Sequence, residues 1–286
     1  MKTVLFKDRL IPKEEVSVSI DDRGYYFGDG VYDVFRIYNG RLYEQEAHLL
    51  RLERSAWEAR IALPYPIREI GRKLEELLNE EKVLGGTLYV QITRGEAERI
   101  HHFPERAFPV LSAFCKSAER PLEKIRGGIR ALLLPDLRWL RCDIKSLNMM
   151  PNVMAKQQAI DSGYDEAIFE RNGIVTECTS SNLLIAKEGT LYTHPANEFI
   201  LHGITRGVVI RLAAELGVPL LEQAFTVEQL MKADEVMVIG TMAEVTPVVQ
   251  IDGKPVGAGQ VGPLAQKLQA AFEATFDPDR TGGTEP

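Results

Sequence analysis

Lys145 is the lysine whose sequence surroundings best suit covalent chemistry. It lies in the segment RCDIKSLN, between Ile144 and Leu147, just before a predicted helix that begins NVMAKQQ. Aliphatic neighbours at such a junction can partly desolvate an amine and make it a nucleophile. An ordinary surface lysine is the alternative on this local pattern alone.

Two further patterns could serve a charged ring and its anionic group. Glu177 is followed by four small polar residues in VTECTSSN, so it could partner a protonated ring nitrogen while the hydroxyl groups line the ring. The run HGITR precedes a predicted helix, and the free N–H groups at the start of this helix, near Thr205, would suit a phosphate. Gly240-Thr241 follows a predicted strand and could bind the same phosphate, and Arg51 could supply a positive charge. The alternatives are a strand glutamate facing water, a helix cap at Thr205 and a solvated helix face at Arg51.

A loop and a set of tyrosines complete the chemically suggestive residues. Arg99 and His101 occupy alternate positions in TRGEAERIHHFP and could together grip a carboxylate, although an exposed loop without that role fits as well. Tyr25, Tyr26 and Tyr32 lie near GDGVYD and could equally be core or interface aromatics.

Hydrophobic periodicity predicts the elements that position these residues. Residues 31–38 alternate as a strand, and Asn39-Gly40 supplies the tight turn of a hairpin. Residues 46–62 and 67–81 have helical spacing, and the second of these helices is entered through Pro66. The alternation places two sets of side chains on opposite faces of the strand: Tyr32, Val34, Arg36 and Tyr38 on one, and Val31, Asp33, Phe35 and Ile37 on the other. Later hairpins with occasional helices favour an α+β fold over a doubly wound parallel sheet.

Length and composition set the broader frame. At roughly 150 residues per domain, 286 residues predict two domains: a small α/β domain over residues 1–117, a linker over 118–128, and a larger domain over 129–286. The 41 acidic residues exceed the 34 basic ones, which argues against nucleic-acid binding. The three cysteines form no CxxC pair, so no metal site is expected. Without a run of about 18 apolar residues or an apolar leader, we expect a cytoplasmic protein that does not enter a membrane.

The joint order of these motifs resembles the fold-type-IV pyridoxal-phosphate enzymes, which include the D-amino-acid, branched-chain and (R)-amine transaminases. The resemblance runs from DDRGYYFGDGVY to VTPVVQIDGK. Within the family it is greatest to the bacterial D-amino-acid transaminases, through RGYYFGDGVY, RWLRCDIKSLN and YTHPAN. It implies a two-domain α+β enzyme with the cofactor, pyridoxal 5′-phosphate, in the domain interface. The larger C-terminal domain would be the cofactor-binding domain.

The resemblance also implies residue roles. Lys145 would form the Schiff base with the cofactor and move the proton at the substrate Cα, and Glu177 would hold the pyridine nitrogen. Leu201 would pack behind the ring. The phosphate would be held by Arg51, Ile204, Thr205 and Thr241. The substrate carboxylate would be held by Tyr32, Arg99 and His101, the last two reaching in from the neighbouring subunit of a homodimer.

The predicted reaction moves the amino group of a D-amino acid to a 2-oxo acid. A branched-chain L-amino-acid or an (R)-amine transaminase is the alternative within the family, and a non-catalytic phosphometabolite-binding protein is the alternative outside it. Some positions depart from the family pattern: Cys178 replaces a common glycine, Leu184 an aromatic residue, and Met242 and Ala243 small hydroxyl residues. The last two put the side-chain preference of the pocket in question.

Overall fold

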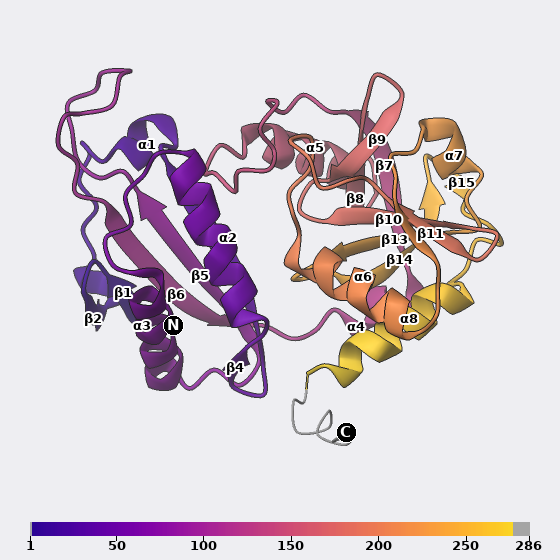
Figure 1. The fold of residues 1–286 in the computed structure, drawn as a ribbon, viewed down its shortest axis with the longest axis horizontal. Coiled ribbons are helices and arrows are strands. Elements are labelled where there is room, and N and C mark those ends of the chain that lie inside the picture. The colour runs from indigo at the N-terminus through magenta and orange to yellow at the C-terminus, as the bar shows by residue number, and fades with distance from the viewer. Residues whose placement is uncertain (1, 277–286) are drawn as a thin grey trace. The chain divides into compact units, whose positions relative to one another are not determined.

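The computed structural model describes residues 2–276. The chain forms two compact units. The N-terminal unit contains the residues up to Arg120 together with Ile144–Met149, and the C-terminal unit contains Pro121–Asp143 and the residues from Met150 onward. Each unit has its own sheet and helices (Figure 1).

An antiparallel sheet of six strands forms the base of the N-terminal unit, in the order β2-β1-β6-β5-β3-β4. Its strands are β1 (Thr3–Phe6), β2 (Arg9–Pro12), β3 (Gly30–Tyr38), β4 (Arg41–Leu42), β5 (Gly86–Thr93) and β6 (Val110–Ser117). The predicted turn between β3 and β4 is confirmed, because Asn39 and Gly40 both have positive φ, at 51° and 73°.

Two long helices, α2 (Gln45–Glu58) and α3 (Ile67–Glu81), lie across one face of this sheet (Figure 1). Their apolar stripes, which include Leu52 of α2 and Leu74 of α3, join one hydrophobic core with the strands. The face of β3 predicted to carry Val31, Asp33, Phe35 and Ile37 is completely buried, and Arg36 and Tyr38 of the opposite face are buried as well. The predicted helix over residues 67–81 matches α3, whereas α2 ends four residues before the predicted residue 62. The short helices of the unit are η1 (Lys13–Glu15) and α1 (Arg23–Phe27).

The C-terminal unit is built on a mixed sheet of nine strands, in the order β12-β11-β10-β13-β14-β7-β8-β9, with β15 beside β14. The strands are β7 (Ile129–Pro135), β8 (Glu166–Arg171), β9 (Ile174–Cys178), β10 (Asn182–Lys187), β11 (Thr190–Thr193), β12 (Leu220–Glu222), β13 (Glu235–Gly240), β14 (Glu244–Ile251) and β15 (Lys254–Pro255). The helices are α4 (Leu122–Gly127), α5 (Met150–Asp161), α6 (Ile204–Glu215), α7 (Val227–Met231) and α8 (Pro263–Ala274). Hairpins with interspersed helices confirm the predicted α+β class.

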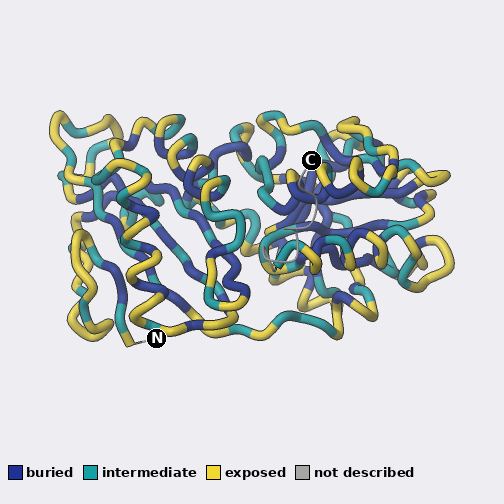
Figure 2. Tube along the Cα trace, turned by 60° about the horizontal axis from the view of Figure 1, so that its bottom comes forward, coloured by how far each residue is buried: buried dark blue, intermediate teal, exposed yellow. Residues whose placement is uncertain are grey.

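The unit boundaries differ from the predicted domains in two places. Residues 122–127, expected within a linker, form α4, and Ile125 of this helix is buried in the C-terminal unit. The segment Ile144–Met149, expected in the larger domain, belongs to the N-terminal unit because Ile144 joins that unit's core and Ser146 pairs with Val31 of β3. Buried residues follow the strands and helices within each unit (Figure 2). Within residues 2–276, none of the helices combines the length and apolarity needed to cross a membrane.

Candidate active site

Lys145 is fixed against β3 through its main chain. Its carbonyl accepts a hydrogen bond of 3.0 Å from the Tyr32 N–H, and the next ladder bond runs from the Leu147 N–H to the Gly30 carbonyl, also at 3.0 Å. The Lys145 N–H lies 3.2 Å from the Oγ of Ser55, a buried residue of α2. A strand and a helix therefore hold the backbone, while the Lys145 side chain remains half-buried.

Arg51 lies on the face of α2 that packs on the sheet, so the solvated-face interpretation is wrong. Its Nε and Nη2 donate to the two oxygens of Asp33, at 2.9 and 2.7 Å, and His48 Nδ1 lies 2.8 Å from Asp33 Oδ1. Burial alone would raise the pKa of Asp33, but Arg51 and His48 hold it well below its usual range. The buried charge on β3 is thus compensated by two residues of α2.

Arg99 and His101 are exposed on the long loop between β5 and β6. The Arg99 guanidinium carbon lies 5.1 Å from the centre of the Phe27 ring, and the His101 ring centre lies 5.7 Å from it. The loop therefore presents two side chains that can donate hydrogen bonds beside one aromatic ring.

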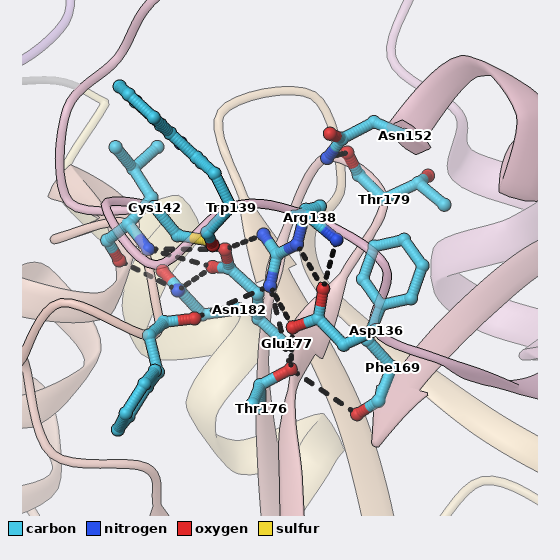
Figure 3. Close-up of polar contacts among 12 residues, drawn as sticks. Asp136, Arg138, Trp139, Cys142, Asn152, Phe169, Thr176, Glu177, Thr179 and Asn182 are labelled. Carbon is cyan, nitrogen blue, oxygen red and sulfur yellow. Dashed lines mark hydrogen bonds and ion pairs between the residues drawn. The ribbon is translucent and has the colours of Figure 1, made fainter. Parts of the chain in front are cut away.

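Glu177 lies on β9 in the C-terminal unit and is only 4% exposed. Its carboxylate accepts from Asn182 Nδ2 at 2.8 Å, from the Leu201 N–H at 3.1 Å, and from the Arg138 guanidinium (Figure 3). Arg138 also forms an ion pair of 2.8 Å with the buried Asp136. Burial raises the pKa of Glu177, while Arg138 and the Leu201 N–H oppose that rise by stabilising the carboxylate.

The start of α6, in the same unit, carries the residues predicted to hold an anion. Its N-cap is Gly203, and a glycine has no side chain that could accept from the first N–H groups of the helix. These N–H groups belong to Ile204 and Thr205. A Cβ at position 203 would meet Asn182 Oδ1 at 2.0 Å, so only glycine permits this approach. The hydroxyl of Ser181 is buried without a hydrogen-bond partner, and Ser181 packs against Gly240, the residue before Thr241.

Comparison with known proteins decides the family. The model of the amino-transferase class IV family matches residues 30–251. The D-alanine aminotransferase of Staphylococcus haemolyticus is 46% identical over 273 residues, which cover 95% of this chain and 97% of that protein. The D-alanine aminotransferase of Bacillus licheniformis is 45% identical and covers 94% of this chain and 95% of its own. The chain belongs to the class IV aminotransferases.

Solved structures agree with this assignment. The branched-chain amino acid aminotransferase of Escherichia coli has a TM-score of 0.91 at 26% identity, covering 97% of this chain and 95% of that one. A second branched-chain amino acid aminotransferase, solved with pyridoxamine 5′-phosphate, has a TM-score of 0.88 at 27% identity and covers 98% of this chain and 96% of its own. The fold is therefore fold type IV. This class IV aminotransferase is a pyridoxal-phosphate enzyme that acts on amino acids and 2-oxo acids.

The residues of the C-terminal unit fit that cofactor. Arg138, Asn182 and the Leu201 N–H donate to the Glu177 carboxylate, and the Leu201 N–H lies close to both of its oxygens. A buried carboxylate held in place by such donors is the type of group that can accept from a protonated ring nitrogen. The N-terminus of α6 and the unpartnered Ser181 hydroxyl suit a phosphate, which accepts several hydrogen bonds. Leu201 is tied to Glu177 through its N–H, which fixes it next to the same carboxylate.

The residues that depart from the family pattern have distinct environments. Cys178 and Leu184 are buried within strands β9 and β10, where they contribute to packing. Met242 is 43% exposed in the turn after β13, and Ala243 packs against the core of the unit. Met242 is thus the most exposed of these four residues, and it follows the predicted phosphate residue Thr241 directly.

Several residues that shape the site were not predicted from the sequence. Asp33 and His48 around Arg51, and Arg138 and Asp136 around Glu177, are partners that meet only in the folded chain. A signal for Asp33 was available, because it shares a strand face with three large apolar residues and a buried carboxylate requires a partner. Among residues 2–276, His, Cys, Asp and Glu side chains form no group of three or more that could hold a metal ion.

Proposed function

We propose that this class IV aminotransferase moves the amino group of a D-amino acid, such as D-alanine, to a 2-oxo acid. The observation that carries this proposal is the 43–46% identity to D-alanine aminotransferases over almost the whole chain. The solved branched-chain aminotransferases have a similar fold but only 25–29% identity. The paired Arg99 and His101 also suit a substrate carboxylate, which a D-amino acid carries and a simple (R)-amine lacks.

We propose the following roles in the C-terminal unit. When bound, pyridoxal phosphate supplies an electron sink for the negative charge that develops at the substrate Cα. Glu177, whose carboxylate is stabilised by Arg138, holds the proton of the ring nitrogen. Leu201 packs behind the ring, and the phosphate is held by Ile204, Thr205 and Thr241.

Residues of the N-terminal unit supply the remaining proposed roles. The Lys145 amine binds the cofactor covalently and then carries the proton to and from the substrate Cα. Arg51 contributes a positive charge to the phosphate, and its ion pair with Asp33 fixes the guanidinium. The substrate carboxylate is held by Tyr32, Arg99 and His101.

We further propose a cytoplasmic homodimer in which Arg99 and His101 serve the neighbouring subunit. The three cysteines are buried and free of disulfides, as is usual in a reducing compartment. Tyr25 and Phe108 of the N-terminal unit are 73% and 81% exposed, and a second subunit would cover such apolar side chains.

Half-reactions test the proposed substrate. Purified holoenzyme is mixed separately with D-alanine, D-glutamate, L-alanine, L-leucine and an (R)-amine, and the absorbance of the bound cofactor is followed. We expect rapid spectral change with the two D-amino acids and almost none with L-alanine. A fast change in cofactor absorbance with L-leucine would instead assign the branched-chain activity. An absorbance that stays constant with all five compounds would support a binding protein.

A further inference from the structure

The loop that carries Arg99 and His101 is tied down at its base. It joins β5 to β6, and its Gly95 carbonyl accepts from the Arg23 N–H at 2.9 Å. Gly95 has a φ of +94°, and a Cβ there would meet the Phe108 carbonyl at 2.0 Å, so the two ends of the loop approach too closely for any other residue. The contacts at Gly95 fix only the base of the loop. The tip of the loop, residues 99–101, needs further contacts to be fixed in place.

Asp29 provides the charge that organises those contacts. Its Oδ2 accepts from Arg23 Nε and from Arg94 Nε, each at 2.8 Å, and its Oδ1 accepts from Arg94 Nη2 at 3.0 Å. Both guanidinium groups are almost fully buried. Burial alone would raise the pKa of Asp29, but the two arginines lower it, so the carboxylate is ionised at neutral pH.

Arg23 carries the influence of Asp29 to the tip of the loop. Its Nη1 donates a 2.7 Å hydrogen bond to the carbonyl of Ile100, the residue between Arg99 and His101. Its guanidinium carbon also lies 4.8 Å from the centre of the Phe27 ring, the ring that Arg99 and His101 contact. Arg23 therefore fixes both the main chain between these residues and the ring beside them.

Arg94 joins the same loop to helix α2. Its Nη2 and Nη1 donate to the carbonyls of Ala59 and Arg60, at 2.9 and 2.7 Å, where the end of α2 leaves carbonyls without helical partners. Its guanidinium carbon lies 3.8 Å from the centre of the Phe103 ring, farther along the loop. Through Arg94, the Asp29 carboxylate therefore organises contacts of both the loop and α2, the helix that carries Arg51.

We propose that Asp29 is a positioning residue that sets the place of Arg99 and His101 through Arg23 and Arg94, and so governs how well the enzyme holds the substrate carboxylate. The inference rests on the proposed role of that loop. Asp29 itself donates nothing to the substrate, because an ionised carboxylate only accepts hydrogen bonds.

The decisive variant is Asp29→Asn in the holoenzyme, which keeps the shape of the side chain but removes the charge and one acceptor. We expect KM for D-alanine to rise by about tenfold or more, the scale set by the loss of a charge-assisted hydrogen bond, while kcat and cofactor content change little. Amide hydrogen exchange over residues 95–108 is expected to become faster, with no change in β3. Glu81→Gln is the control, because Glu81 accepts two N–H groups in the same unit away from this loop.

A second variant keeps the inference falsifiable if Asp29→Asn does not fold. Arg23→Met removes the hydrogen bond to Ile100 and is expected to give the same rise in KM and the same faster exchange. Unchanged KM or unchanged exchange in the folded variant would overturn the positioning role. Arg99→Ala separates the two levels: if it leaves KM unaltered, the proposed role of the loop is wrong, and if it raises KM while Asp29→Asn does not, only the role of Asp29 is wrong.

Discussion

The Nζ of Lys145 lies 4.3 Å from the centre of the Tyr32 ring, and the Tyr32 N–H donates to the Lys145 carbonyl. Main chain and side chain therefore pair the same two residues. A cation over an aromatic face is attracted by the ring quadrupole, so Tyr32 orients the Lys145 side chain as well as its backbone. The predicted covalent residue and a predicted carboxylate-binding residue are thus neighbours in one unit.

Lys145→Ala should abolish covalent attachment of the cofactor and nearly all turnover. The fold should survive, because the main-chain bonds of residue 145 do not need the side chain. Borohydride reduction of the native enzyme followed by peptide mapping should place the label on Lys145. Lys187→Ala is the control, since Lys187 pairs with Asp234 at the surface; label on any other lysine would contradict the assignment.

Glu177→Gln should retain the cofactor but slow proton removal from the substrate Cα by orders of magnitude. A neutral amide cannot stabilise a protonated ring nitrogen, so the electron sink is weakened. The rate of exchange of the Cα deuterium of D-alanine with solvent measures this step directly. Near-normal exchange in the variant, judged against Glu228→Gln at the surface, would return Glu177 to a structural role.

Arg51→Ala should weaken binding of pyridoxal phosphate by about ten- to a hundredfold, as the loss of a charge-assisted contact of roughly 1.5–3 kcal/mol implies. It should also lower the free energy of unfolding, by up to about 3–5 kcal/mol, because the buried Asp33 carboxylate loses its guanidinium partner and retains His48. The double variant Arg51→Ala/Asp33→Asn separates the effects: stability should recover while affinity stays low. Recovery of affinity as well would show that Arg51 acts only on the fold.

The same cluster predicts a pH dependence of stability. Burial lowers the pKa of His48 below its ordinary value, and Asp33 opposes this only in part. The unfolded chain therefore binds more protons at this histidine than the folded chain, so stability is present above about pH 6.5 and declines as the pH falls below it. Chemical denaturation at pH 7.5 and pH 5.5 tests this. His48→Gln should lose less stability over the interval than the native protein; an equal loss would place the dependence elsewhere.

Arg99→Ala should lower kcat/KM for D-alanine by on the order of a hundredfold or more, because a planar, always-charged donor to the carboxylate is lost. An (R)-amine without a carboxylate should be spared. Arg106→Ala on the same loop is the matched control. Equal losses for both substrates would mean that Arg99 has a structural role.

Local patterns predicted the elements well, and non-local contacts explain what they missed. Residues 67–81 carry their own helical spacing behind Pro66, so α3 could be placed without knowing the rest of the fold. The grouping of Ile144–Met149 with the N-terminal unit could not, because it depends on pairing with β3, which is remote in sequence. The same holds for Arg138, whose guanidinium meets Glu177 from 39 positions away.

The placement of Ile144–Met149 also determines how the chain could be divided into fragments that each contain a complete unit. The polypeptide passes between the two units three times, at Arg120, Asp143 and Met149. A fragment that ended at Arg120 would lack the segment that completes its own unit, and a fragment that began at Pro121 would carry that segment away. A chimaera that combines units from two related enzymes therefore needs more than one junction. Lys145 must come from the enzyme that supplies the N-terminal unit.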